Sequence, residues 1–204
     1  MGLYSQTIFP LLCDFGLNRS FVAKHRRDLL AGASGRILEI GFGTGLNVPH
    51  YPPDVRKLTA VDPNVGMHRR AEKRVRQRGI EVDRRIVGGE RLPFEDGSFD
   101  CVVSTFTLCS INQIAEALSE VHRVLNVGGQ FLFLEHGLSP EPNVQKWQRR
   151  LNWLQKRVAG GCHLDRDIRA LVGALPFGSM NIDEFYLEKT PRMHGYMYRG
   201  VAIK

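Results

Sequence analysis

The sequence predicts an α/β fold: a single domain, residues 1–204, built on one doubly wound, mostly parallel sheet of seven strands that ends in an antiparallel hairpin. Two observations predict it. Short apolar runs alternate with helical stretches along most of the chain, an order typical of parallel strands joined by right-handed crossovers. Near the C-terminal end, two strand-like runs follow each other with no helix between them, which predicts the hairpin.

The expected strands are short runs rich in apolar residues, bounded by Gly, Pro or Asp. The first five cover residues 36–41, 57–62, 83–89, 99–106 and 129–136, and the hairpin covers 183–189 and 195–204. Residues 65–79 predict a helix that Gly79 ends as a C-cap. Residues 113–129 predict a second helix, with one apolar face formed by Ile114, Leu118, Val121 and Leu125.

Charge and composition limit the partners. The formal net charge of +7 is compatible with nucleic acid, anionic lipid or acidic small molecules. The arginines are spread over several expected helices, however, which favours solvated helix faces. The chain contains no zinc-finger or RNP motif, so we expect no nucleic-acid partner. No run approaches the roughly 18 apolar residues of a membrane-spanning helix, so a soluble protein is expected.

The cysteines indicate a reducing compartment. Four are present, and none forms a CxxC pair: Cys13, Cys101, Cys109 and Cys162. This scatter favours reduced thiols in a cytoplasmic protein over a disulfide framework or a zinc site. The sequence therefore predicts no metal ion.

A glycine-rich turn follows the first strand in EIGFGTGL, residues 39–46. A dinucleotide-binding turn needs a sixth-place glycine for close helix packing, and that place is held by Leu46. The alternative is ExGxGxG, in which Glu39 ends the strand and the backbone of Gly41 and Gly43 passes close to a ligand without phosphate. Asp62 ends the second strand, where a carboxylate can accept both hydroxyls of a ribose. An ordinary tight turn explains the glycines alone, but not their combination with this acid.

These motifs, with LPFEDGSFDCVV and RVLNVGG, resemble those of the class I S-adenosylmethionine-dependent methyltransferases over nearly the whole chain. The resemblance implies a Rossmann-like methyltransferase fold and S-adenosyl-L-methionine as cofactor, released as S-adenosyl-L-homocysteine. One departure concerns adenine recognition, because Gly88 stands where many relatives carry Asp. The cofactor site that the resemblance implies consists of Glu39, Gly41, Phe42, Gly43, Gly45, Asn47, Asp62, Pro63, Asn64, Met67, Gly89, Glu90, Thr105 and Leu108. For Leu108, plain core packing is the alternative.

A narrower likeness rests on GTGLNVPHYPP, TAVDPN, FTLCS, FLEHG and GGCHLDRDI. These segments resemble the methyltransferase-like seven proteins, thiol S-methyltransferases that act on small lipophilic thiols, and their bacterial relatives. The resemblance implies a thiol acceptor, with a phospholipid amine or a quinone ring carbon as alternatives. A cofactor-binding protein without catalysis is a further alternative. We expect the apolar N-terminal anchor of the animal proteins to be absent.

Three candidate catalytic residues follow from the chemistry of a thiol acceptor, which attacks chiefly as thiolate. His136 ends the fifth strand at the carboxyl edge of the sheet, where it is a candidate base or substrate-orienting group. His163 and Arg166 lie in a glycine-hinged loop, from which a cation could stabilise a thiolate. The alternatives are a structural histidine for His136 and a surface ion pair for Arg166. Cys162 is expected to be a packed thiol.

Two segments outside the alternating order are expected to complete the site. Residues 1–34 predict an N-terminal helical cap that covers the cofactor and shapes the acceptor pocket. Residues 140–176 predict a lid-like helical insertion before the hairpin. Peripheral contact with anionic lipid is an alternative role for the first helix, because Lys24, Arg26 and Arg27 follow it. The apolar side chains expected on the cap are Tyr4, Ile8, Phe9, Leu12 and Phe15.

Overall fold

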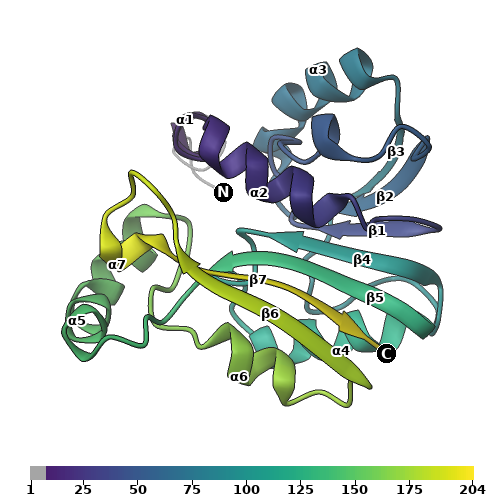
Figure 1. The fold of residues 1–204 in the computed structure, drawn as a ribbon. Helices are drawn as coiled ribbons and strands as arrows, with labels where there is room; N and C mark the ends of the chain where they lie inside the picture. The colour runs from purple at the N-terminus through teal and green to yellow at the C-terminus, as the bar shows by residue number, and fades with distance from the viewer. Residues whose placement is uncertain (1–7) are drawn as a thin grey trace.

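The structure is a computed structural model that describes residues 8–204, without the side chains at positions 68 and 69. Within this range, seven strands form one sheet in the order β3-β2-β1-β4-β5-β7-β6 (Figure 1). The predicted fold class is therefore confirmed. The strands are β1 Ile37–Ile40, β2 Lys57–Val61, β3 Glu81–Arg85, β4 Phe99–Thr105, β5 Leu125–His136, β6 Ser179–Tyr186 and β7 Tyr196–Ile203.

The strand order creates a switch point beside β1. From β1 the chain moves outward through β2 to β3, then crosses back to place β4 on the other side of β1, with β5 beyond it. These five strands pair in parallel, and β7 pairs antiparallel with both β5 and β6. In open α/β sheets, ligands bind outside the carboxyl ends of the strands at such a point.

Helices cover both faces of the sheet (Figure 1). Helices α2 Ser20–Leu30 and α3 His68–Arg78 lie on one face, and α4 Ile114–Val124 and α6 Ile168–Gly173 lie on the other. Near the carboxyl ends of the parallel strands lie α1 Phe9–Leu17, α5 Pro142–Val158 and the short α7 Arg192–Gly195. Two single-turn 3₁₀ helices follow β1 and β2: η2 Val48–His50 and η3 Val65–Met67.

The core consists of two apolar clusters, one on each face of the sheet. Along β4, Val102 packs with the cluster that includes α4, whereas the next residue, Val103, packs with the cluster that includes α2. This alternation follows from the two-residue period of a strand, and both faces are buried as expected for a parallel sheet. Of the apolar face predicted for the second helix, Leu118 and Val121 lie fully buried.

Several element boundaries differ from the prediction. The third strand is β3 Glu81–Arg85 rather than 83–89: it is an edge strand, and the chain leaves the sheet at Ile86, which is 57% exposed. Leu125, predicted on a helix face, begins β5 because it pairs with Phe99 ahead of a register shift. The predicted C-cap is confirmed, since Gly79 has φ 68° in the left-handed region.

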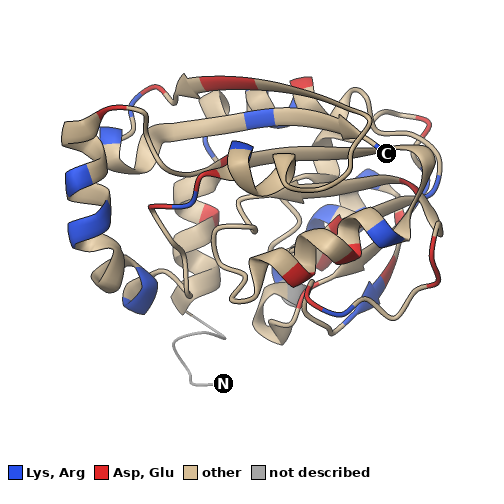
Figure 2. Cartoon of the chain, turned by 90° about the horizontal axis from the view of Figure 1, so that it is seen from below, with Lys and Arg blue, Asp and Glu red and all other residues tan. Residues whose placement is uncertain are grey.

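Charged side chains are distributed over many elements rather than gathered on one. Figure 2 shows Lys and Arg on several helices and strands; Asp and Glu lie among most of them, but α5 carries Lys and Arg without an acidic residue. Some pairs are i,i+4 ion pairs on helix surfaces, such as Lys24 with Asp28 and Arg76 with Glu72. In the described part of the chain, no helix is long and apolar enough to cross a membrane.

Candidate functional site

A cavity of about 500 Å³ opens at the switch point, outside the carboxyl ends of β1, β2 and β4. Its volume falls within the roughly 300–1,000 Å³ typical of small-molecule sites. The turns after β1, β2, β3 and β4 form its walls, and α1 and the end of α5 close it. Twelve of the residues predicted to bind cofactor line it: Glu39, Gly41, Phe42, Gly43, Asn47, Asp62, Pro63, Asn64, Met67, Gly89, Glu90 and Thr105.

The glycine-rich turn brings backbone to the cavity wall. Gly41, Gly43 and Gly45 all have positive φ, at 74°, 53° and 75°. A Cβ on Gly41 would lie 2.0 Å from Oγ1 of Thr107, so no larger residue fits there. A Cβ on Gly43 would meet no protein atom closer than 3.9 Å, because it would point into open space at the cavity. Gly43 therefore leaves room for a ligand against the backbone.

Asp62 connects the two turns. Its Oδ2 accepts the backbone N–H of Gly43 at 2.7 Å, and its Oδ1 accepts the backbone N–H of Asn64 at 2.7 Å. These bonds fix the carboxylate between the turns after β1 and β2. A carboxylate oxygen can accept more than one hydrogen bond, so both oxygens can also accept from a ligand hydroxyl.

Two predicted cofactor residues do not line the cavity. Gly45 packs against α3 instead, where an added Cβ would lie 3.1 Å from Cα of Ala71. Gly45 thus allows the turn to pack closely against a helix, which is the role of the sixth-place glycine in a dinucleotide-binding turn. Leu108 is 1% exposed within the apolar core, and its carbonyl faces Arg166. Core packing, the alternative for Leu108, is the arrangement observed.

A buried polar network forms the floor of the cavity, and two of its members, Arg26 and Tyr51, were not predicted as site residues. Arg26, from α2, is 3% exposed and donates from Nη1 to Oδ1 of Asn47 and Oγ1 of Thr105, both at 2.6 Å. Asn47 in turn donates to Glu39 at 2.9 Å, and the hydroxyl of Tyr51 donates to the same carboxylate at 2.7 Å. Among the described residues, Nε of Arg26 has no hydrogen-bond partner.

Burial shifts both charged members of this network toward their neutral forms. Burial raises the pKa of Glu39 to about 7, although the bonds from Tyr51 and Asn47 and the charge of Arg26 oppose it. Burial lowers the pKa of Arg26 to about 10, against the opposing effect of Glu39. At neutral pH, Arg26 remains charged, whereas Glu39 holds a proton part of the time.

Glu90 occupies the space above Gly88. A Cβ on Gly88 would lie 2.3 Å from Oε2 of Glu90, and both residues line the cavity. The carboxylate therefore lies where an aspartate at position 88 would begin its side chain. This placement favours Glu90 as the group that accepts a hydrogen bond from adenine, in place of the aspartate that many relatives carry at the position of Gly88.

The helix α1 and the segment after α5 form the roof. Phe9, Cys13 and Leu17 line the cavity from α1. The Phe9 ring contacts the turn after α5, because a Cβ on Gly160 would lie 2.6 Å from its Cζ. Burial raises the pKa of the Cys13 thiol to about 11, so it stays protonated at neutral pH.

Only part of the predicted set of apolar roof residues lines the cavity. Phe9 lines the cavity, but Leu12 is 53% exposed and Phe15 is 73% exposed, both on the outer side of α1. Ile8, at the start of the helix, is also exposed. The reason is the helical period, which places Phe9, Cys13 and Leu17 on one face at i, i+4 and i+8. Tyr4 lies outside the described residues.

The three candidate catalytic residues do not line the cavity. His136 is buried, and its Nε2 lies 2.9 Å from Sγ of Cys162. Arg166 is also buried and donates to the backbone carbonyls of Leu108 and Ile111, which is a structural arrangement. The ring of His163 lies 3.7 Å from the carboxylate of Asp165. Their predicted roles in catalysis gain no support from this placement.

A strained residue marks the cavity wall after β4. Phe106 lines the cavity and has φ 53°, which is rare for an aromatic residue and found mostly where function or packing demands it. The next residue, Thr107, donates its backbone N–H to both carboxylate oxygens of Glu135, at 2.9 and 3.0 Å. Buried Glu135 therefore fixes this turn. The sequence pattern STFT gave no sign of the conformation.

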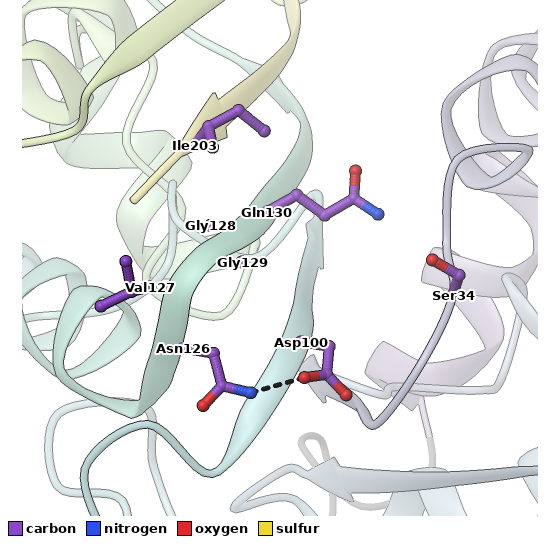
Figure 3. A pocket seen from close by; sticks show the side chains of 8 residues that line it. All are labelled: Ser34, Asp100, Asn126, Val127, Gly128, Gly129, Gln130 and Ile203. Atoms are coloured by element: carbon purple, nitrogen blue, oxygen red, sulfur yellow. Dashed lines mark hydrogen bonds between the residues drawn. The ribbon is translucent and has the colours of Figure 1, made fainter.

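A second cavity, of about 620 Å³, lies at the opposite edge of the sheet, near the amino ends of β4 and β5 (Figure 3). Figure 3 shows the amide of Asn126 directed at the carboxylate of Asp100, which accepts its hydrogen bond at 2.5 Å. Asp100 also accepts the backbone N–H of Arg36. None of the predicted site residues lies here, and its polar groups bond one another.

The fold and the first cavity together define a class of protein. A seven-stranded sheet with an antiparallel end, a glycine-rich turn after β1 and an acid after β2 are the features of Rossmann-like methyltransferases. A family model for a methyltransferase domain matches residues 38–133, from β1 to β5. The match covers the turn at Gly43, Asp62 and the strand that ends near Phe106.

Comparison with known proteins narrows the class. The chain is 37% identical over 176 residues to the thiol S-methyltransferase TMT1B of Rattus norvegicus, covering 79% of this chain and 72% of that one. It is 33% identical over 193 residues to the thiol S-methyltransferase TMT1A of Homo sapiens, covering 86% and 78%. The protein therefore belongs to the S-adenosylmethionine-dependent methyltransferases, and S-adenosylmethionine is its cofactor.

Solved structures agree on the fold. A S-adenosylmethionine-dependent methyltransferase from Thermotoga maritima superposes with a TM-score of 0.70 over 98% of both chains. The two sequences are 20% identical, so this likeness shows the architecture alone.

Proposed function

We propose that the protein methylates the sulfur of a small lipophilic thiol. The observation that carries the proposal is that one cavity joins the turn at Gly43 and Asp62 to the apolar side chains of Phe9, Leu17 and Phe106. A polar cofactor end and an apolar acceptor end thus share one cavity. Similarity to thiol S-methyltransferases over most of the chain supports sulfur as the acceptor atom.

The residues at the polar end fit the cofactor. Open space in front of Gly43 admits the methionine moiety close to the backbone, and the guanidinium of Arg26, with its unpaired Nε, suits the carboxylate of that moiety. Asp62 suits the ribose hydroxyls, and Glu90, above Gly88, suits the amino group of adenine. When bound, S-adenosylmethionine supplies a sulfonium methyl group for in-line displacement by the acceptor.

The remaining residues would orient the acceptor and support its charge. Phe9 and Leu17 offer an apolar surface to a lipophilic thiol, and Phe106 closes the opposite wall. A thiol reacts as thiolate, which a nearby positive charge favours. Arg157, at the end of α5, lines the cavity and supplies such a charge at its rim. In this proposal Arg157 takes the role that the sequence suggested for Arg166.

We also propose a cellular compartment and a kind of partner for the enzyme. All four cysteines lie in the described region and are free of disulfides, as is typical of proteins in the reducing cytoplasm. We therefore place the enzyme in the cytoplasm. Its partner is a small lipophilic molecule rather than nucleic acid, because the site is a cavity of small-molecule size and the positive charges are spread over several elements.

The experiment is a methyl-transfer assay with deuterium-labelled S-adenosylmethionine and a panel of acceptors, with products identified by mass. The panel contains alkyl and aryl thiols, hydrogen sulfide, phosphatidylethanolamine and a demethylated quinone. We expect a labelled thioether from the lipophilic thiols. Transfer to the lipid amine or the quinone alone would overturn the thiol assignment while retaining the cofactor site.

A matched pair of variants tests the site within the same assay. Gly43 and Gly79 both have positive φ, and a Cβ on either meets no atom within about 3.9 Å. Alanine costs backbone strain of roughly 1–2 kcal/mol at both positions. Because only Gly43 faces the cavity, Gly43→Ala should raise the KM for cofactor at least tenfold, whereas Gly79→Ala should leave it unchanged.

A further inference from the structure

Three metal-binding side chains from distant parts of the sequence meet behind the cavity. Cys109 lies in the loop after β4, His136 ends β5, and Cys162 lies in the segment after α5. Their exposed fractions are 2%, 8% and 7%. The two sulfur atoms and a ring nitrogen of His136 all lie within 4.8 Å of one another, and Nε2 of His136 is 2.9 Å from Sγ of Cys162. Methyl transfer requires none of the three.

The fold explains how they come together. β4 and β5 are neighbours in the sheet, with Thr105 opposite Leu134, so the chain leaves both strands at the same edge. Beyond α5, Gly160 and Gly161 adopt left-handed φ values of 59° and 88° and turn the chain back toward the sheet. The backbone N–H of His163 then donates to the carbonyl of Cys109 at 2.8 Å, which holds the segment in place.

The surroundings suit a cation better than an empty core. Nε2 of His136 lies 2.9 Å from Sγ of Cys162 and is the ring nitrogen placed to bind an ion, whereas Nδ1 is buried without a hydrogen-bond partner among residues 8–204. Without a cation, two buried sulfur atoms are packed against one imidazole. A dication replaces the thiol protons and leaves a neutral cluster of two thiolates, one imidazole and the ion. The nearby charges of Glu135 and Arg166 are of opposite sign.

The donor set selects the metal. Two thiolates and one imidazole are ligands that Zn²⁺ binds well, whereas Mg²⁺ and Ca²⁺ prefer oxygen. Three protein ligands leave the fourth tetrahedral position to water or another donor. No sequence motif indicates such a site, because zinc motifs depend on cysteine pairs close in sequence and here the ligands are separated by 27 and 26 positions.

We propose that Cys109, His136 and Cys162 bind one Zn²⁺, which ties the segment after α5 to the carboxyl ends of β4 and β5. The site lies directly behind the cavity wall, because Ser110, next to Cys109, and Gly160, two residues before Cys162, both line the cavity. The ion thus fixes the roof on the acceptor side. This inference does not depend on the acceptor being a thiol.

The test measures metal binding, not methyl transfer. Purified full-length protein, kept reduced and stripped of metal, is titrated with Co²⁺ and then with Zn²⁺. We expect one equivalent of Co²⁺ to bind with the intense thiolate-to-cobalt charge-transfer absorption and the visible bands of a tetrahedral site, both lost when Zn²⁺ displaces it. Binding of Co²⁺ without the charge-transfer band would overturn the proposal.

Cysteine variants supply the matched control. Cys162→Ala should weaken Zn²⁺ binding at least about 100-fold, measured by competition with a chromophoric chelator. Cys101→Ala removes an equally buried thiol from β4, outside the cluster, and should retain the wild-type affinity. Equal affinities in the two variants would contradict the site. So would a Cys109–Cys162 disulfide in protein purified without reductant. The cobalt spectrum of the wild type decides the matter even if Cys162→Ala does not fold.

Discussion

At the residue scale, the site depends on a buried cation that sequence patterns did not reveal. Arg26 lies on an amphipathic helix next to Arg27, and nothing in the segment KHRRDL distinguishes the two positions. In the structure Arg26 is buried against Asn47 and Thr105 at the cavity, whereas Arg27 is exposed. Burial of a charge is costly unless hydrogen bonds compensate for it, so such a residue is a strong sign of function.

Replacing this cation should weaken cofactor binding. Arg26→Met keeps most of the side-chain volume but removes the donor to Asn47 and Thr105 and the charge proposed to meet the methionine carboxylate. We expect the dissociation constant for S-adenosylhomocysteine to rise at least about tenfold, the equivalent of roughly 1.4 kcal/mol. Arg27→Met, one residue further along α2, is the control and should bind normally. Calorimetric titration of both variants makes the comparison.

Glu39 should make folding stability depend on pH. Burial raises its pKa to about 7 in the folded protein, from its ordinary value of 4.5. Between these values the folded state holds a proton that the unfolded state has released, so this residue's contribution to stability is complete below about pH 4.5 and is lost as the pH rises to about 7. Glu39→Gln should remove roughly 1–3 kcal/mol of this pH dependence, measured by denaturant unfolding of cofactor-free protein at pH 5 and pH 8. An unchanged pH dependence would show that Glu39 is ionised throughout.

The sequence predicted the position of a residue where that position depends on strand order. Gly43 lies in the turn after β1 and Asp62 directly follows β2, so strand order alone places them at the same sheet edge. The sequence did not predict the position of a residue where that position depends on long-range packing. His136 was a candidate catalytic residue because it ends β5 at the carboxyl edge of the sheet. In the structure it does not line the cavity, and its ring contacts the segment around Cys162 instead. Arg166 was expected near the acceptor, yet two backbone carbonyls take up its guanidinium.

At the element scale, α1 determines how the acceptor end is closed. Its inner face carries Phe9, Cys13 and Leu17, and its outer face exposes Phe15, over which the guanidinium of Arg19 stacks at 4.3 Å. The Phe9 ring bridges α1 to Gly160, so the helix and the segment after α5 meet over the cavity. The exposed apolar side of α1 is also the surface that would serve the peripheral lipid contact expected from the sequence.

Shortening Phe9 should affect the acceptor more than the cofactor. Phe9→Ala opens the roof at Gly160, so we expect the KM for a lipophilic thiol to rise several-fold while the affinity for S-adenosylhomocysteine stays within a factor of about two. Phe15→Ala, an exposed position on the same helix, should change neither. If both variants behave alike, α1 does not shape the acceptor site. Steady-state kinetics with both variants provide the measurement.

At the scale of the whole molecule, the strand order was predictable because it depends on patterns that repeat along the chain. Apolar runs and helical periods alternate through β5, and the last two runs lack a helix between them, which required the hairpin of β6 and β7. Strand ends were less predictable, as β3 shows, because edge strands are only partly buried and their apolar pattern is weak. The net charge of +7 says little about the fold, because Lys and Arg side chains are spread over solvated faces of several elements.

The cavity at the switch point is the site that we assign to S-adenosylmethionine. The most direct measurement is calorimetric titration of S-adenosylhomocysteine into the wild type and into Asp62→Asn, which keeps the side-chain shape but replaces a carboxylate oxygen that accepts hydrogen bonds with an amide that donates them. We expect one binding site for S-adenosylhomocysteine per chain in the wild type, and an affinity for it at least about tenfold lower in the variant. Equal binding by the two proteins would contradict this assignment and place the cofactor elsewhere.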